Sequence, residues 1–125
     1  MDFTAHMAEG RQLIEGYGNG GFRVSGAVHR GSVLVFADRT LAWAVSDMAA
    51  LSHESLAAVR QAEPRIEVLL LGCGAKAMPV PAALRESLRA DGVVIEAMDT
   101  GAACRTFNLL IAEERRAAAA LIAVD

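Results

Sequence analysis

The second half of the chain alternates between apolar runs and amphipathic segments. Residues 66–71 are apolar at every position but one, which is typical of a strand buried in a parallel sheet. Residues 93–98 predict a second strand, and residues 81–90 predict a helix that begins with a proline. Residues 100–116 predict the longest helix, and residues 118–124 a closing strand. The pattern therefore predicts a β-α-β-α-β portion of an α/β fold.

This alternation also predicts where ligands would meet the sheet. The strands on either side of helix 81–90 should run parallel, joined by a right-handed crossover. The loops 72–80 and 99–101 follow these two strands, so both should open on the same edge of the sheet. In open α/β sheets that edge is the usual ligand crevice.

The first half of the chain is rich in turn-forming residues. Asn19-Gly20 is a favoured hairpin pair, because both residues accept a positive φ. The strands predicted in this half are 22–25, 27–29, 32–37 and 41–45. Together they indicate an antiparallel meander. Residues 52–62 predict a helix that ends before Pro64.

Composition narrows the class of protein. A length of 125 residues without a linker or repeat predicts a single domain over residues 1–125. The 54% hydrophobic and 22% charged residues argue against disorder. The net charge of −3 disfavours nucleic acid or an anionic membrane as the main partner, because both require a basic face.

The cysteine count and the absence of sorting signals predict a compartment. Two cysteines are too few for a disulfide framework, so we expect reduced thiols. No apolar stretch approaches the length of a transmembrane helix, and the first residues do not read as a secretory signal. The sequence therefore predicts a cytoplasmic protein.

A glycine turn follows the first buried strand in the sequence LLLGCGAKAMPVP. Gly72 and Gly74 at this place resemble the dinucleotide-binding fingerprint. That fingerprint needs a helix that starts directly after the turn, because the helix N-terminus binds the pyrophosphate. Pro79 and Pro81 delay the helix, since the residue before a proline avoids the helical conformation. We therefore predict no nucleotide cofactor.

Two cysteines lie at the predicted sheet edge. Cys73 stands between the glycines of the turn, and Cys104 lies near the start of the long helix, where the helix dipole would lower its thiol pKa. The two thiols would approach each other if both loops share an edge. The alternative is that each cysteine is a small buried side chain, as free cysteines commonly are.

The start of the long predicted helix carries polar residues that suit two roles. Asp99 and Thr100 can cap a helix that packs closely on the sheet. Alternatively, a free helix N-terminus binds an anion, with Lys76 and Arg105 as counter-charges and Asn108 lining the crevice.

Metal binding is not predicted from the histidines. None of the three lies at ligand spacing from another histidine, a cysteine or a carboxylate; they are His6, His29 and His53.

A series of motifs extends over nearly the whole chain, from about Ile14 to the C-terminus. They are Tyr17-x-x-Gly20-x-Phe22, Gly31-Ser32-Val33-Leu34, Trp43, Glu67-Val68-Leu69-Leu70-Leu71-Gly72-x-Gly74, Glu96-x-Met98-x-Thr100-x-Ala102, Phe107-Asn108-x-Leu110 and Glu113-x-Arg115. This order resembles the Mth-type domain family, long catalogued as a domain of unknown function. That family includes the adipogenesis-associated Mth-domain protein and a mitochondrial assembly factor of respiratory complex I.

The resemblance implies a three-layer α/β fold with a central mixed sheet and no established enzymatic activity. It also implies protein contacts, because the mitochondrial relative works through them during complex assembly. Phe107 stands where the family commonly has tyrosine, and Glu114 stands where it commonly has glycine. The missing hydroxyl weakens any acid/base role at position 107.

Two classes of function follow from these observations. The first is a non-enzymatic binding or assembly domain that holds a protein partner, with self-association left open. The second is a small-molecule or anion-binding protein, or a thiol enzyme, that uses the crevice between loops 72–80 and 99–101. The candidate ligand-binding residues are Gly72, Cys73, Gly74, Lys76, Asp99, Thr100, Cys104, Arg105 and Asn108.

Overall fold

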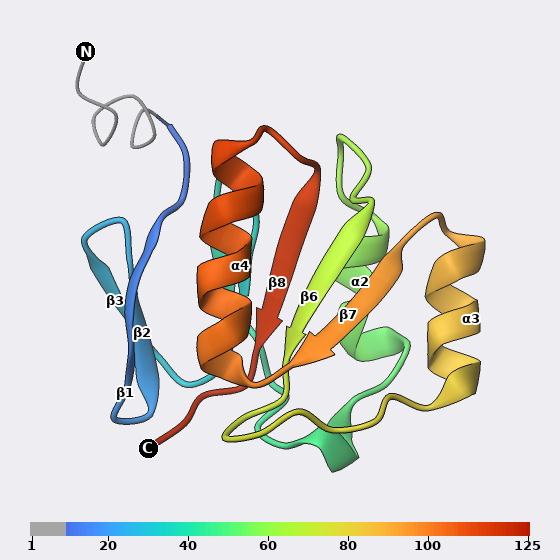
Figure 1. The fold of residues 1–125 in the computed structure, drawn as a ribbon. Coiled ribbons are helices and arrows are strands. Elements are labelled where there is room, and N and C mark those ends of the chain that lie inside the picture. The colour runs from blue at the N-terminus through green and yellow to red at the C-terminus, as the bar shows by residue number, and fades with distance from the viewer. Residues whose placement is uncertain (1–9) are drawn as a thin grey trace.

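Residues 10–125 are described by the computed structural model, which contains two β-sheets and three α-helices in this part of the chain (Figure 1). The elements are β1 (Ile14–Gly18), β2 (Gly21–Val24), β3 (Ala27–Arg30), β4 (Val33–Val35), β5 (Thr40–Ala42), two 3₁₀ turns (Met48–Ala50 and Glu54–Leu56), α2 (Ala57–Arg60), β6 (Val68–Gly72), α3 (Ala82–Ala90), β7 (Val94–Met98), α4 (Thr100–Ala112) and β8 (Ala117–Leu121).

The strands form one antiparallel sheet and one mixed sheet. β1, β2 and β3 make a three-stranded antiparallel meander, and the predicted turn at Asn19-Gly20 joins β1 to β2. The second sheet has the order β5-β4-β8-β6-β7, in which β6 is parallel to both β7 and β8 while β4 is antiparallel to β8. The predicted α/β class, with a central mixed sheet and a C-terminal β-α-β-α-β portion, is confirmed.

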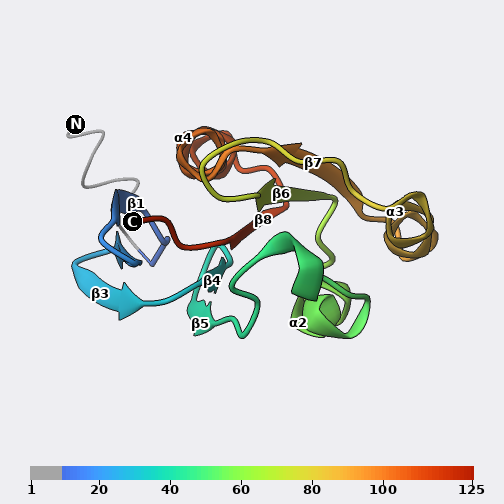
Figure 2. The same ribbon diagram turned by 90° about the horizontal axis from the view of Figure 1, so that it is seen from below.

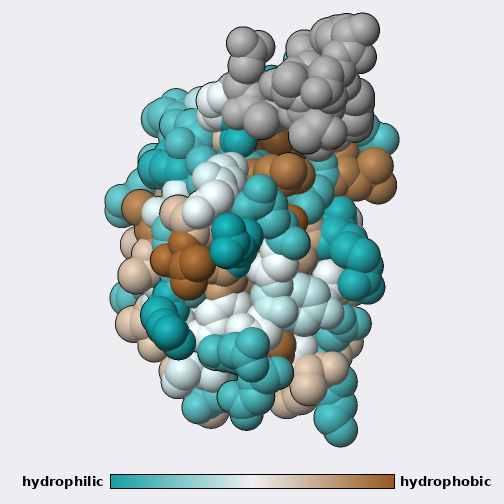
Figure 3. Space-filling view, turned by 90° about the vertical axis from the view of Figure 1, so that its left-hand side faces the viewer, coloured by the Kyte–Doolittle hydropathy of each residue, from teal (hydrophilic) through white to brown (hydrophobic). Residues whose placement is uncertain are grey.

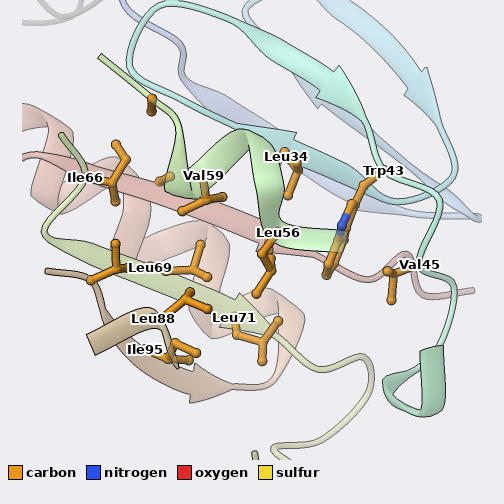
Figure 4. Close-up of a cluster of buried hydrophobic side chains, with 14 of the residues drawn as sticks. Leu34, Trp43, Val45, Leu56, Val59, Ile66, Leu69, Leu71, Leu88 and Ile95 are labelled. Carbon is orange, nitrogen blue, oxygen red and sulfur yellow. The ribbon is translucent and has the colours of Figure 1, made fainter. Parts of the chain in front are cut away.

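Two hydrophobic clusters lie on opposite faces of the five-stranded sheet, because successive strand side chains point to opposite faces. On one face, Leu69 and Leu71 of β6 pack with Leu56, Val59 and Leu88, which come from the segment ending in α2 and from α3 (Figure 4). The other cluster contains buried side chains of α4, of the three-stranded sheet and of the alanine-rich β8. Figure 2 shows the resulting layers, with α4 and α2 on opposite sides of β6 and β8.

Several predicted elements differ from those in the structure. The strands predicted at 32–37 and 41–45 are the shorter β4 and β5, which belong to the mixed sheet and not to the meander. The closing strand predicted at 118–124 is β8, Ala117–Leu121. β1 was missed, because its sequence IEGYG contains two glycines, which weaken a strand signal. The predicted helix 52–62 is a 3₁₀ turn followed by the single helical turn of α2. The predicted helix 100–116 ends at Ala112, so Glu114 and Arg115 lie beyond it.

The C-terminus of α4 is closed by a Schellman motif. The Glu114 N–H donates to the Ile111 carbonyl, and the Arg115 N–H donates to the Leu110 carbonyl, both at 2.9 Å. This motif needs a left-handed residue at its centre, and Glu114 takes that conformation with φ of 60°. Glycine suits this position better than any L-residue, because it has no Cβ to clash.

Replacing Glu114 by glycine is expected to raise the free energy of unfolding by about 1 kcal/mol, since it removes left-handed strain. Urea unfolding followed by circular dichroism measures this. The control is Glu113→Gly, because Glu113 has an ordinary φ of −89° and glycine there only adds unfolded-state entropy. Equal effects of the two substitutions would contradict the argument.

Candidate functional site

The parallel strands of the mixed sheet end at one level. Gly72 of β6 is in register with Met98 of β7 and with Leu121 of β8. The loops 72–80 and 99–101 therefore share an edge of the sheet, as predicted. We call this the carboxyl edge.

Thr100 ties the loops at the centre of the carboxyl edge together. Its hydroxyl donates to the Ile122 carbonyl at 2.7 Å and accepts from the Gly74 N–H at 3.0 Å, while its own N–H donates to the Gly74 carbonyl at 2.9 Å. Thr100 is fully buried. A Cβ at Gly72 would lie 3.0 Å from both Thr100 and Leu121, so a glycine is needed for this close approach. Gly72, Gly74 and Thr100 thus serve packing.

The N-terminus of α4 is capped by this chain's own groups. A carboxylate oxygen of Asp99 accepts from the Ala102 N–H at 2.9 Å. The phenol of Tyr17 lies against Gly101, where an added Cβ would overlap the hydroxyl. Tyr17 is 48% exposed and was not among the predicted site residues, although the motif Tyr17-x-x-Gly20 had singled it out. The Ala102 N–H that binds the Asp99 carboxylate is a helix N-terminal donor that a bound anion would need.

The other polar candidates are dispersed. Lys76 and Arg105 are exposed, and their side chains form no hydrogen bond or ion pair with the rest of residues 10–125. The Asn108 side chain instead fastens β1, because its oxygen accepts from the Ile14 N–H at 2.9 Å and its amide donates to the Ile14 carbonyl at 2.8 Å. The amide of Asn108 therefore joins α4 to the three-stranded sheet.

The two cysteines lie on opposite faces of the mixed sheet. Cys73 belongs to the cluster that includes α2 and α3, and Cys104 belongs to the cluster that includes α4. Both thiols are free and buried. The expectation that the two thiols approach each other is wrong. Two loops can share a sheet edge while the side chains next to them point into opposite layers, as those of Cys73 and Cys104 do.

Burial raises the pKa of the Cys104 thiol to about 12, although the nearby Arg105 acts to lower it. The predicted lowering of this pKa is wrong, since desolvation inside a hydrophobic cluster outweighs the lowering by Arg105. At neutral pH this thiol is protonated and therefore a poor nucleophile.

This shift gives a pH-dependent stability. The folded state keeps the Cys104 thiol protonated up to about pH 12, whereas the unfolded thiol ionises near its ordinary value of 9.0. The stabilisation is complete below pH 9 and is lost between pH 9 and 12, at about 1.4 kcal/mol per pH unit. Between pH 8 and pH 10 the wild type should therefore lose about 1 kcal/mol more than Cys104→Ala in urea unfolding. Identical losses would refute the assignment.

A hollow of about 370 Å³ lies at the opposite edge of the sheet. Residues of four segments line it: 10–11, 36–39 after β4, 62–66 before β6, and 114–117 between α4 and β8. We call it the amino-edge hollow. Sequence reasoning missed it, because these segments are distant in the chain. The adjacent Arg115 and Arg116 were its only local signal, and they had been assigned to the end of a helix.

Within residues 10–125, no group of three or more histidine, cysteine, aspartate or glutamate side chains is placed to hold a metal ion. His6 lies outside the described residues. No helix in the described part of the chain is long and apolar enough to cross a membrane.

Comparisons with known proteins agree with this architecture. Residues 14–122 match the family described as "Protein of unknown function (DUF498/DUF598)". NADH dehydrogenase [ubiquinone] 1 alpha subcomplex assembly factor 3 of Danio rerio is 41% identical over 110 residues, which cover 88% of this chain and 63% of that protein. This chain thus spans just under two thirds of that relative's length.

Two solved structures share the fold. The crystal structure of a protein of Bartonella henselae, described as an outer membrane protein, is 39% identical with a TM-score of 0.85 and covers 93% of this chain and 98% of that one. A Mth938-like domain of Bordetella pertussis is 28% identical with a TM-score of 0.76 and covers 89% and 85%. The resemblance inferred from the motifs is confirmed. This chain belongs to the DUF498/DUF598 family and has the Mth938-like fold.

Proposed function

We propose that this chain is a cytoplasmic binding protein that holds a protein partner during assembly of a respiratory NADH dehydrogenase, rather than an enzyme. The observation that carries the proposal is the relationship to assembly factor 3, which is 41% identical over 88% of this chain. The family match over residues 14–122 includes both sheets and α4, so the shared element is the folded unit itself.

The geometry of the candidate site favours binding over thiol catalysis. At the carboxyl edge, where a substrate would be expected, Thr100 is fully buried and its hydroxyl is engaged with two backbone groups. Cys104 is protonated at neutral pH, and Cys73 is only 8% exposed. A protein partner needs none of these groups to react.

The surface offers contacts of the kind that transient partners use. Large apolar side chains are exposed at Tyr17 of β1, Val28 of β3 and Leu109 of α4. Figure 3 shows the side of the molecule that carries the three-stranded sheet, where hydrophobic side chains appear as separate spots among polar ones. Non-obligate interfaces have such a mixed character.

Deletion of the gene in the source organism tests the proposal. We expect less fully assembled NADH dehydrogenase on native gels, lower NADH oxidation by membranes, and accumulation of subassemblies. A tagged copy should restore assembly and co-purify with subunits of that enzyme. Normal amounts of assembled enzyme in the deletion strain would refute the assembly role.

A double variant, Cys73→Ala with Cys104→Ala, separates binding from thiol chemistry. We expect it to restore assembly as well as the wild type does, provided that circular dichroism shows it folded. Loss of rescue by a folded double variant would favour a thiol enzyme instead.

A further inference from the structure

The amino-edge hollow combines apolar walls with arginine side chains. We propose that it binds a small organic anion, a carboxylate attached to an apolar ring system. This site is separate from the carboxyl edge and does not depend on the assembly role proposed above.

The apolar part of the site is preformed. Phe36, Ile66 and Ala117 line the hollow, and each is anchored in the core with 7% exposure or less. The volume of about 370 Å³ lies within the range of small-molecule pockets. A dry cavity of roughly 150 Å³ accommodates benzene, so this hollow has room for two fused rings and a carboxylate.

Two arginines are held in place beside these walls. One guanidinium nitrogen of Arg11 donates to the Ile111 carbonyl at 2.9 Å, at the end of α4. The Arg39 guanidinium lies 4.2 Å from the centre of the Phe36 ring. Each guanidinium has five N–H donors, so both keep donors for a carboxylate, which guanidinium groups bind in a forked geometry.

The charged side chains that line the hollow favour an anion over a cation. The lining includes Arg11, Arg39, Arg115 and Arg116 as well as three carboxylates, of Asp38, Glu63 and Glu114. All three carboxylate residues are exposed, as are Arg115 and Arg116, whereas Arg11 and Arg39 are partly buried. Because the Arg39 guanidinium lies over the Phe36 ring, a ligand seated on the apolar walls lies beside this cation.

The existing ion pairs leave room for a ligand carboxylate. Arg39 pairs with Asp38 at 3.0 Å, and their side chains are 40% and 70% exposed, so a ligand can compete with this pair. Arg115 forms no hydrogen bond or ion pair through its side chain with any residue of 10–125. Arg115 and Arg39 are therefore the residues whose removal should weaken anion binding without disturbing the core.

Three probes with one ring system test the charge preference. 1-Naphthoate, 1-naphthalenemethanol and 1-naphthylmethylamine carry an anionic, a neutral and a cationic group, and calorimetry on the full chain measures the binding of each. We expect naphthoate to bind at least tenfold more tightly than the alcohol and the amine to bind most weakly. Equal binding of the three, or no naphthoate binding at millimolar concentration, would overturn the proposal.

Charge-matched variants locate the site. Arg39→Gln combined with Arg115→Gln should weaken naphthoate binding at least tenfold, with the circular dichroism spectrum unchanged. The control is Arg105→Gln combined with Arg89→Gln, which removes the same charge from exposed positions outside the hollow. An equal loss in the control would show general charge attraction, and a loss in the control alone would place the site elsewhere; either result overturns the proposal.

Discussion

Replacing Phe107 by alanine should lower the free energy of unfolding by about 3–5 kcal/mol, because a buried phenylalanine leaves a large cavity. Phe107 is fully buried in α4, in the cluster that contains Phe22 of the three-stranded sheet and Leu121 of β8. It therefore helps to join both sheets and a helix. A loss of this size is a large fraction of the total stability of a small protein. Urea unfolding followed by circular dichroism measures it.

The matched control is Leu109→Ala, two residues further along α4. Leu109 is 58% exposed, so its truncation should change the free energy of unfolding by less than about 0.5 kcal/mol. A Phe107→Ala variant that loses no more than this control would contradict the assigned packing of α4.

Replacing Thr100 by valine should cost about 2–4 kcal/mol, although the two side chains have nearly the same shape. The change removes the hydroxyl that accepts from the Gly74 N–H and donates to the Ile122 carbonyl. Both backbone groups would then be buried without a partner, and each such group carries a desolvation penalty. Thermal and urea unfolding both report the loss.

Thr100→Ser keeps the hydroxyl and removes only a methyl group, so it should cost about 1 kcal/mol. Equal stability of the serine and valine variants would show that the two hydrogen bonds of the Thr100 hydroxyl do not stabilise the fold.

The sequence placed the main elements well where the pattern is local. β6, α3, β7 and β8 lie where the apolar runs and the amphipathic segment predicted them, because strand and helix periods are written into consecutive residues. β1 was not predicted, because Gly16 and Gly18 have no side chains that could show the alternation of apolar and polar residues typical of a strand. The end of α4 was placed too late, because a glutamate rather than a glycine stands at the left-handed position.

The candidate site was predicted only in part. Strand direction alone implied that the loops after β6 and β7 share an edge, and they do. The role of Thr100 at that edge depends on its partners, because its hydroxyl reaches the carbonyl of Ile122, 22 residues away. A threonine after an aspartate reads equally well as a cap or as a ligand, and only its distant partners distinguish the two.

The sequence by itself determined the order and type of most elements, the parallel β6–β7 pair and the family, because these follow from local periodicity and short motifs. Only the tertiary structure decided that Cys73 and Cys104 face opposite layers and that desolvation governs the Cys104 pKa. It alone also formed the amino-edge hollow, which is lined by residues from Gly10 to Ala117. Burial and cavities depend on which distant segments of the chain pack together, and local sequence patterns do not determine this.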